Sequence, residues 1–338
     1  MARLVAGLLA SAQGKGVVFF GESQAGYRLP QGLDLSVAPI TRPQTWSLLQ
    51  SAIPETLKLI GRVGGRRAWS RVDPVLFAEH PVGKEALAHV RHMAHAFGHA
   101  AEPIPPRSLG PGRSGMVLRD AVLLHRATLE GNLDRWLDQQ PVRRLPPDEA
   151  MAVHPDGSAT LETADERMDV GQTVLADDRA MIQFLPPTLW PSLLLRRVAS
   201  TILTQPTSPL AAAVMHRVDT GMMLHQQAGG ILAVGPGAID PFAAALDLQL
   251  GPERAYRQAG QSSYETVVTG DGAPAVGRVQ GTGPDIIAGF GATGAFLAPA
   301  IARWLTGSAS RAESDWFGAR LVDRTPTASP VADFGGAG

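Results

Sequence analysis

Glycines cluster in the stretch DIIAGFGATGAFLAPAIARWLTG, residues 285–307, where an apolar run meets a short turn that leads into a second apolar run. Gly289, Gly291 and Gly294 carry no side chain, so a flat ligand could approach the backbone of this turn closely. We predict a strand over 285–290 before the turn and a helix over 294–305 after it. Such a helix end offers unpaired N–H groups and about half a positive elementary charge. The turn could therefore stabilise a ligand that gains electrons, although a tight structural connection would explain it equally well.

A second motif stands just upstream, in TVVTGDGAPAVGRV. Its Thr269, Asp271, Pro274 and Gly277 follow a predicted strand. Together the two stretches resemble the C-terminal flavin-contacting region of the D-amino-acid oxidase, glycine oxidase and sarcosine oxidase superfamily. That family shows T-x-D-x-x-P-x-[IV]-G, then a strand, then G-[HF]-[GS]-x-x-G before a helix with an early proline, which here is Pro299.

Weaker similarities extend this resemblance along the chain. Residues 221–237, GMMLHQQAGGILAVGPG, are similar to the family's substrate-domain hairpin, and residues 315–324 are similar to the segment after its last helix. The resemblance implies an enzyme that binds FAD and oxidises a small amine or amino acid, with hydride transfer to the flavin and hydrolysis of the imine product. It also implies that the flavin ring lies against the glycine turn. The implied cofactor contacts there are Gly289, Phe290, Gly291, Ala292, Thr293, Gly294 and Ala295.

The N-terminal segment predicts a helix, a turn and a strand. An apolar helix is expected over 1–12, a break at Gly14 and a buried strand over 17–20. Glu22 follows at the place where dinucleotide-binding folds hold a ribose hydroxyl, so it is a further candidate for FAD contact. In the family, a first strand and pyrophosphate-binding glycines precede this helix, and here they would lie before Met1. Either the sequence begins downstream of the natural start, or the chain is a degenerate, non-catalytic relative that acts as a subunit or binding module.

Two further positions depart from the family pattern. In VLADDRAMIQFLPP, residues 174–187, Asp177 and Asp178 replace small residues that lie close to the cofactor in relatives. Thr266 stands where many relatives carry an arginine that grips the substrate carboxylate. We expect other side chains to line a substrate pocket, and each of them could instead be an ordinary surface or packing residue. The candidates are His225, Tyr264 and Arg217, with Arg257 as a further cation.

The composition narrows the class of partner. The chain has 338 residues with 30 basic and 31 acidic side chains, so no field of one sign is present to concentrate nucleic acid. It has no cysteine, which excludes disulfides and thiolate metal sites and agrees with a cytoplasmic location. The apolar start is too short to span a membrane. The expected partner is a small-molecule amine or amino acid, and a partner subunit or a homo-oligomer is left open.

Four histidines follow one predicted helix face at a helical spacing. Ligands along one straight helix cannot converge on a tetrahedral ion, and no second segment offers evident partners, so no metal is expected. The four are His89, His92, His95 and His99.

Strands and helices alternate along the chain, which indicates an α/β or α+β fold. Helices are also predicted over 84–97, 121–137 and 188–200. The resemblance implies a Rossmann-like FAD-binding domain that lacks its first strand, interleaved with an antiparallel-sheet substrate domain. The FAD-binding domain is expected to comprise residues 1–45, 110–185 and 265–325, the substrate domain residues 46–109 and 186–264, and a flexible tail residues 326–338.

Overall fold

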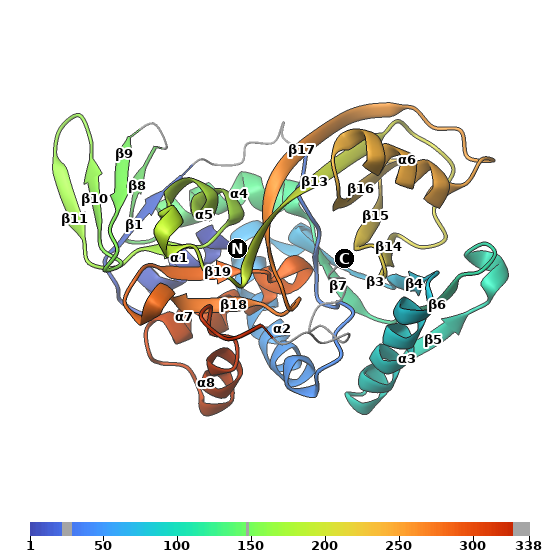
Figure 1. The fold of residues 1–338 in the computed structure, drawn as a ribbon, viewed down its shortest axis with the longest axis horizontal. Helices are drawn as coiled ribbons and strands as arrows, with labels where there is room; N and C mark the ends of the chain where they lie inside the picture. Colours follow the sequence, from blue (N-terminus) through green and yellow to red (C-terminus); the bar gives the residue numbers. More distant parts are fainter. Residues whose placement is uncertain (22–28, 147–148, 327–338) are drawn as a thin grey trace.

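The computed structural model describes residues 1–21, 29–146 and 149–326, and its elements form a mixed α/β fold (Figure 1). The expected fold class is confirmed. Within the described ranges, no helix is long and apolar enough to cross a membrane. Glu22 and residues 327–338 lie outside the described residues, so the predictions made for them stay predictions.

Two short parallel pairs of strands carry the N-terminal and C-terminal motifs. β1 (Val17–Phe20) pairs with β8 (Val142–Leu145), and β12 (Val174–Leu175) pairs with β19 (Asp285–Ala288). β18 (Ala275–Arg278) continues the second pair in the antiparallel sense. Three of the four residues of β19 are buried, as expected for an apolar run in a parallel strand. Parallel pairing of this kind is what the Rossmann-like prediction requires.

Long amphipathic helices cover this region. α1 (Ala2–Ser11) packs against both α4 (Arg126–Asp138) and α7 (Ala298–Leu305), and α2 (Pro43–Gly64) also contacts these two helices. The buried positions of α2 recur every three or four residues, which places its apolar stripe in the main core. Pro43 begins α2 because the first helical position needs no N–H donor.

The largest sheet has eight strands and is mostly antiparallel. Its two longest strands, β13 and β17, arch from the region of β18 and β19 toward α6 (Figure 1). Helix α6 packs against β13, β16 and β17. In spatial order the strands are β17 (Gln258–Thr269), β13 (Leu194–Thr204), β16 (Gly230–Pro236), β15 (Met222–Gln227), β14 (Val214–Arg217), β4 (Val75–Ala78), β6 (Ser114–Leu118) and β5 (Ala101–Ile104).

Two smaller sheets and four helices complete the described elements. One sheet joins β2 (Asp34–Leu35), β7 (Ala121–Leu124) and β3 (Trp69–Val72); the other joins β11 (Arg167–Val170), β10 (Ala159–Glu162) and β9 (Ala150–Val153). The helices are α3 (Pro81–Ala96), α5 (Asp178–Phe184), α6 (Ile239–Leu250) and α8 (Arg311–Gly318).

Two predicted helices are wrong, and in each case distant strands are the reason. Residues 188–200 were expected to be helical, but Leu194–Thr204 is strand β13 because it pairs with β16 on one side and β17 on the other. Residues 121–137 were expected to form one helix, but Ala121–Leu124 pairs with β2 and β3, and α4 begins only at Arg126. Tertiary pairing overrides local periodicity at both places. The predicted domain boundaries are not tested and stay a prediction.

Candidate functional site

The glycine turn follows β19 as predicted, but the residues after it are not an α-helix at first. Gly289 and Gly291 have positive φ angles of 71 and 48 degrees, which glycine adopts without strain. Gly291–Leu297 is a 3₁₀ segment, and α7 begins only at Ala298. The predicted helix start at 294 is therefore wrong. The macrodipole of α7 consequently lies further from the turn than expected.

The turn is open at Gly291 and closed over the residues that follow. Gly291 is exposed, and no described atom lies within 4 Å of the position that an added Cβ would take. Gly289 is half-buried, and its added Cβ would lie 3.2 Å from Thr269 Cγ2. Phe290 and residues 292–295 are buried. A ligand that approached this backbone would meet Gly289 and Gly291 rather than all seven predicted contacts.

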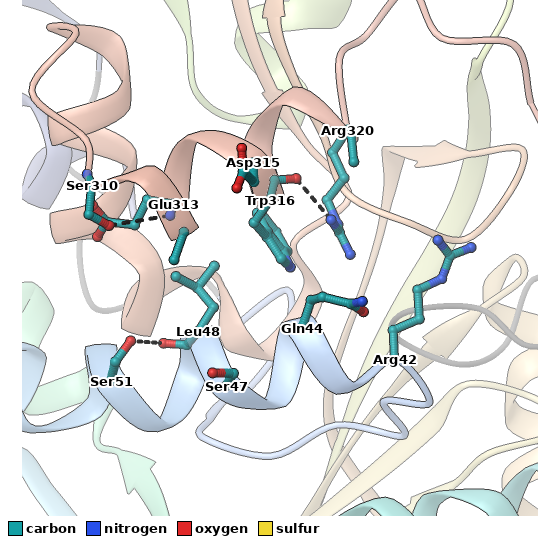
Figure 2. A pocket seen from close by; sticks show the side chains of 12 residues that line it. Arg42, Gln44, Ser47, Leu48, Ser51, Ser310, Glu313, Asp315, Trp316 and Arg320 are labelled. Atoms are coloured by element: carbon teal, nitrogen blue, oxygen red, sulfur yellow. Dashed lines mark hydrogen bonds between the residues drawn. The ribbon is translucent and has the colours of Figure 1, made fainter.

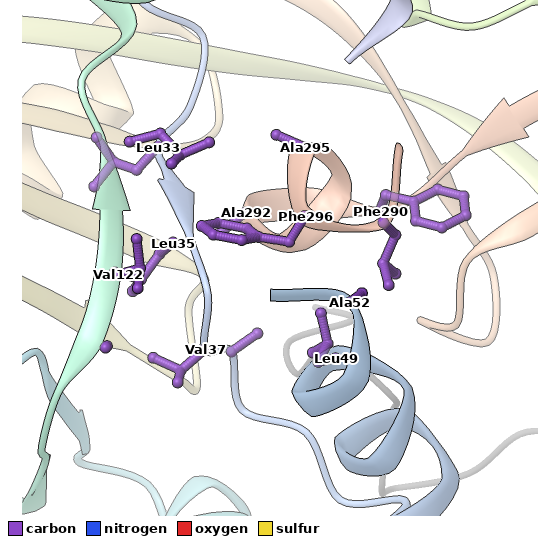
Figure 3. Packing of buried hydrophobic residues seen from close by; sticks show 14 of the residues in the cluster. Leu33, Leu35, Val37, Leu49, Ala52, Val122, Phe290, Ala292, Ala295 and Phe296 are labelled. Carbon is purple, nitrogen blue, oxygen red and sulfur yellow. The ribbon is translucent and has the colours of Figure 1, made fainter. Parts of the chain in front are cut away.

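Hydrophobic packing closes the inner side of the 3₁₀ segment. Figure 3 shows Phe296 pointing from this segment toward Leu35 of β2. The Phe296 carbonyl accepts a hydrogen bond of 2.7 Å from Thr56 Oγ1 on α2. At Gly294, an added Cβ would lie 3.1 Å from Met1 Sδ, so α1 approaches the segment closely. The segment is therefore part of the core and also forms one side of the turn.

The upstream motif is held by an ion pair that the sequence does not reveal. Asp271 accepts two hydrogen bonds of 2.8 Å from Arg324, which follows α8. Arg324 also donates to the Ala273 and Pro274 carbonyls. Burial alone would raise the pKa of the Asp271 carboxyl, but the hydrogen bonds and charge of Arg324 outweigh it and hold the pKa below its usual range. Asp271 thus fixes the loop that leads into β18.

Replacing Asp271 with asparagine is expected to lower the free energy of unfolding by about 1–3 kcal/mol at neutral pH, because the buried guanidinium loses its charged partner. The folded carboxyl has a lowered pKa, so its stabilising contribution is full above the unfolded pKa of about 4 and is lost as the pH falls below that value. Urea unfolding of both proteins across pH 3–7 measures this. Asp315→Asn, at an exposed carboxylate, is the control; an equal loss in both variants, or a loss independent of pH, would contradict the assignment.

Strand register decides which pocket candidates share a face of the large sheet. Pairing runs from His225 to Leu232, from Leu232 to Leu203 and from Leu203 to Gly260, and Gly260 lies on the same side of β17 as Tyr264. His225 and Tyr264 therefore share one face, which we call the inner face. It is lined at Gly260 by Leu29 and at Tyr264 by the Gln31 carbonyl, 3.0 Å from the Tyr264 hydroxyl.

Arg217 does not lie on the inner face. It pairs with Met222 in β15, three residues before His225, so its side chain points to the opposite side of the sheet. There it contacts Asp219 at 2.9 Å and Glu79 at 3.1 Å. Arg257 is exposed near the end of β17. The structure therefore places His225 and Tyr264 on one face but three strands apart, about 14 Å across the sheet, and it puts Arg217 on the opposite face.

Polar side chains from five elements, β2, α4, α5, β13 and β17, gather at the inner face. Arg126 makes two hydrogen bonds to Asp34, of 2.6 and 2.9 Å. Thr266 donates to Asp178 at 2.5 Å. Tyr264 lies within electrostatic reach of both groups, and burial raises the pKa of its phenol. The inner polar cluster, as we call it, consists of Asp34, Arg126, Asp178, Thr201, Tyr264 and Thr266.

Sequence reasoning found only part of this cluster. Tyr264 was a pocket candidate, and Asp178 and Thr266 were noted as departures, but nothing in the sequence joined them. Asp34 and Arg126 were missed. One signal was present for Arg126, since it follows a run of apolar residues at the point where a buried strand ends.

The histidines of α3 make ordinary packing contacts. His89 lies 3.0 Å from the Thr41 carbonyl, and His95 lies 3.0 Å from the Ala101 carbonyl. His99 lies against the ring of Trp46. Across the described part of the chain, no group of three or more histidine or acidic side chains could hold a metal ion.

A surface groove of about 610 Å³ lies between α2 and α8, away from the glycine turn (Figure 2). Trp316 forms part of its wall, and the guanidinium of Arg320 lies 3.9 Å from the centre of the Trp316 ring. The Trp316 Nε1 atom donates to Thr45 Oγ1 at 3.0 Å, which ties α8 to α2. The groove includes no residue of the turn or of the inner polar cluster.

No protein-family model and no curated protein sequence matches the chain. Solved structures do match. An amino acid oxidase essential for nikkomycin biosynthesis, NikD, matches with a TM-score of 0.71 and 14% identity over 93% of each chain. Glycine oxidase from Geobacillus kaustophilus matches with a TM-score of 0.64 and 14% identity over 98% of this chain and 95% of that one. L-Proline dehydrogenase from P. horikoshii matches with a TM-score of 0.68 and 14% identity over 93% of each chain. The chain therefore has the fold of amino acid oxidases and dehydrogenases, and the resemblance expected from its motifs is confirmed at the level of the fold.

Proposed function

We propose that this protein is a flavin-dependent oxidoreductase that oxidises a small amine or amino acid. The observation that carries the proposal is the open glycine turn after β19, which stands in a chain with the fold of amino acid oxidases. Because fold alone does not determine activity, the proposal depends on the residues of the turn and the inner face.

The turn fits the edge of a flavin ring at two residues. Gly291 leaves open space that a side chain would fill, and Gly289 has a positive φ angle of 71 degrees, which lets the chain turn there without strain. The buried residues after Gly291 would support the turn from behind. FAD, when bound, supplies the acceptor for a hydride. Backbone N–H groups of the turn would donate to the ring edge that becomes negative.

The other contributions of the protein to the reaction are to orient the amine and to exclude water from the site. Tyr264 would position the amine on the inner face, since its phenol lies within electrostatic reach of Arg126 and Asp178. His225 lies on the same face but three strands away, so it would line a different part of that face. Burial lowers the pKa of His225, with a further contribution from His125, so its imidazole is neutral at physiological pH. Leu33 and Leu35 would keep water from the inner side of the turn. No acid–base triad is needed, because hydride leaves the neutral amine; an amine that binds as its ammonium must first lose that proton to a nearby carboxylate or to water.

One observation favours a second candidate function, a non-catalytic relative that acts as a subunit or binding module. Residues 292–297 are packed into the core, which leaves a ligand only the exposed edge of the turn. A protein of this fold that no longer binds flavin would tolerate such packing. The proposed domain boundaries, the cytoplasmic location and the partner subunit or homo-oligomer stay predictions under either function.

Titration of the purified full chain with FAD separates the two functions. We expect saturable quenching of flavin fluorescence, and absorbance bands of the flavin that stay with the protein through gel filtration. Anaerobic addition of a substrate amine should then bleach the long-wavelength band. A chain that stays colourless after incubation with excess FAD would contradict the enzyme proposal and support the binding module.

A further inference from the structure

Asp178 is a carboxylate of the inner polar cluster that is held by hydrogen bonds rather than by a described cation. It is the first residue of α5, and its Oδ2 atom accepts the hydrogen bond from Thr266 on β17. In the described part of the chain, no arginine, lysine or histidine lies within ion-pair distance of this carboxylate. Burial raises its pKa above the usual range, although Thr266 and the Val267 N–H both donate to it.

The other charges around the cluster do not neutralise Asp178. Arg126 is engaged by both carboxylate oxygens of Asp34. Arg197, the cross-strand neighbour of Thr266, is exposed to solvent. Asp177 is exposed and adds a second negative charge nearby. The buried ammonium of Met1 also lies within electrostatic reach of Asp34 and Asp177. Arg126 and Met1 therefore offset Asp34 and Asp177, and Asp178 is the carboxylate that gives the described part of the cluster its excess of negative charge.

This charge has a consequence for the ligand that the inner face can accept. A carboxylate brought to Thr266 would face Asp178 and be repelled, because like charges at short range in a partly buried site oppose each other strongly. An ammonium at the same place would make a charge-assisted hydrogen bond. Asp178 and Thr266, the two residues that depart from the family motif, are joined by a hydrogen bond of 2.5 Å, so a ligand at this place would meet both of them.

We propose that Asp178 selects amines without a carboxylate over α-amino acids. This inference rests on the proposed function, and it names the substrate class of the same site. Asp178 is a specificity-determining residue here, and Thr266 is a positioning residue that holds its carboxylate toward the inner face.

Isothermal titration calorimetry of the full chain at pH 7 tests this with four small probes that carry an amine, a carboxylate or both on a branched carbon: isopropylamine, isobutyrate, L-alanine and D-alanine. We expect isopropylamine to bind about tenfold more tightly than either alanine, and Asp178→Asn to weaken isopropylamine binding about tenfold without weakening isobutyrate. Asp177→Asn is the matched control, because it removes the same charge from the neighbouring exposed residue and keeps a good helix cap. Its isopropylamine binding should weaken far less than that of Asp178→Asn, because water screens the exposed charge of Asp177.

A second variant keeps the test informative if Asp178→Asn fails to fold. Thr266→Arg would place a guanidinium beside Asp178 and should make alanine bind at least as tightly as isopropylamine. Equal binding of isopropylamine and alanine to the unmodified chain, or no binding of isopropylamine, would overturn the inference. The outcome is distinguishable from failure of the proposed function: a chain that prefers isopropylamine but takes up no FAD contradicts only the flavin proposal, and a chain that takes up FAD but prefers alanine contradicts only this one.

Discussion

Replacing Gly291 with leucine is expected to weaken FAD binding by about a hundredfold, equivalent to about 3 kcal/mol. The leucine side chain would occupy the open space in front of the turn, where no described atom lies within 4 Å of an added Cβ. A flavin ring and a leucine cannot share that space. Titration of flavin fluorescence with the purified variant measures the change.

The control for this variant is Gly14→Leu. Gly14 also has a positive φ angle, of 62 degrees, and also has open space around its added Cβ, but it lies in the loop between α1 and β1. Both substitutions impose the same kind of backbone strain, so they should lower the melting temperature to a similar extent. If Gly291→Leu binds FAD as tightly as Gly14→Leu does, the turn is not the flavin site.

Replacing Phe296 with alanine is expected to destabilise the protein by about 3–5 kcal/mol, since it opens a large cavity in the core. Phe296 is 0% exposed and lies between β2 and α2, with its carbonyl tied to Thr56. Urea unfolding followed by circular dichroism measures the loss. Leu248→Ala, at a side chain that is 79% exposed, should change stability by less than about 0.5 kcal/mol.

The Phe296 variant also probes the link between packing and the turn. If the 3₁₀ segment supports the turn from behind, Phe296→Ala should weaken FAD binding at temperatures where the protein is still folded. A loss of stability under about 1 kcal/mol would mean that this segment is not packed as described. Unchanged FAD affinity with a large loss of stability would separate the core role of Phe296 from the turn.

The ion pair of Asp271 and Arg324 gives the upstream motif a structural meaning. The threonine, aspartate and proline of that motif stand before β18, and Arg324, from beyond α8, donates to the aspartate and to the Ala273 and Pro274 carbonyls. The two ends of the C-terminal region are therefore fastened together, and Gly289 packs against Thr269 within the same region. The motif therefore helps to hold the glycine turn in position, and it does so without its residues having to contact a ligand.

The sequence determined the elements whose signals are local. Residues 17–20 and 285–290 are short apolar runs bounded by breaks; the first is a strand as predicted, and the second is a strand over 285–288, two residues shorter than predicted. The glycine turn was identified from three closely spaced glycines between two apolar runs, and two of them have positive φ angles. The hairpin of β15 and β16 was indicated by the resemblance of residues 221–237 to the family's substrate-domain hairpin. The resemblance of two spaced motifs was sufficient to indicate the fold.

Only the tertiary structure decided which of these elements pair and which side chains meet. β13 became a strand because two distant partners supply its hydrogen bonds, a stabilisation that its own residues do not encode. Asp178 and Thr266 are 88 residues apart in the chain, and Asp34 and Arg126 are 92 apart. The sequence suggested both Arg217 and His225 as pocket residues. Arg217 pairs with Met222, which is three residues before His225 in β15, so the two side chains point to opposite faces of the sheet. The side chains of a polar site come from distant segments of the chain. Its geometry therefore depends on tertiary contacts, which no local sequence pattern encodes.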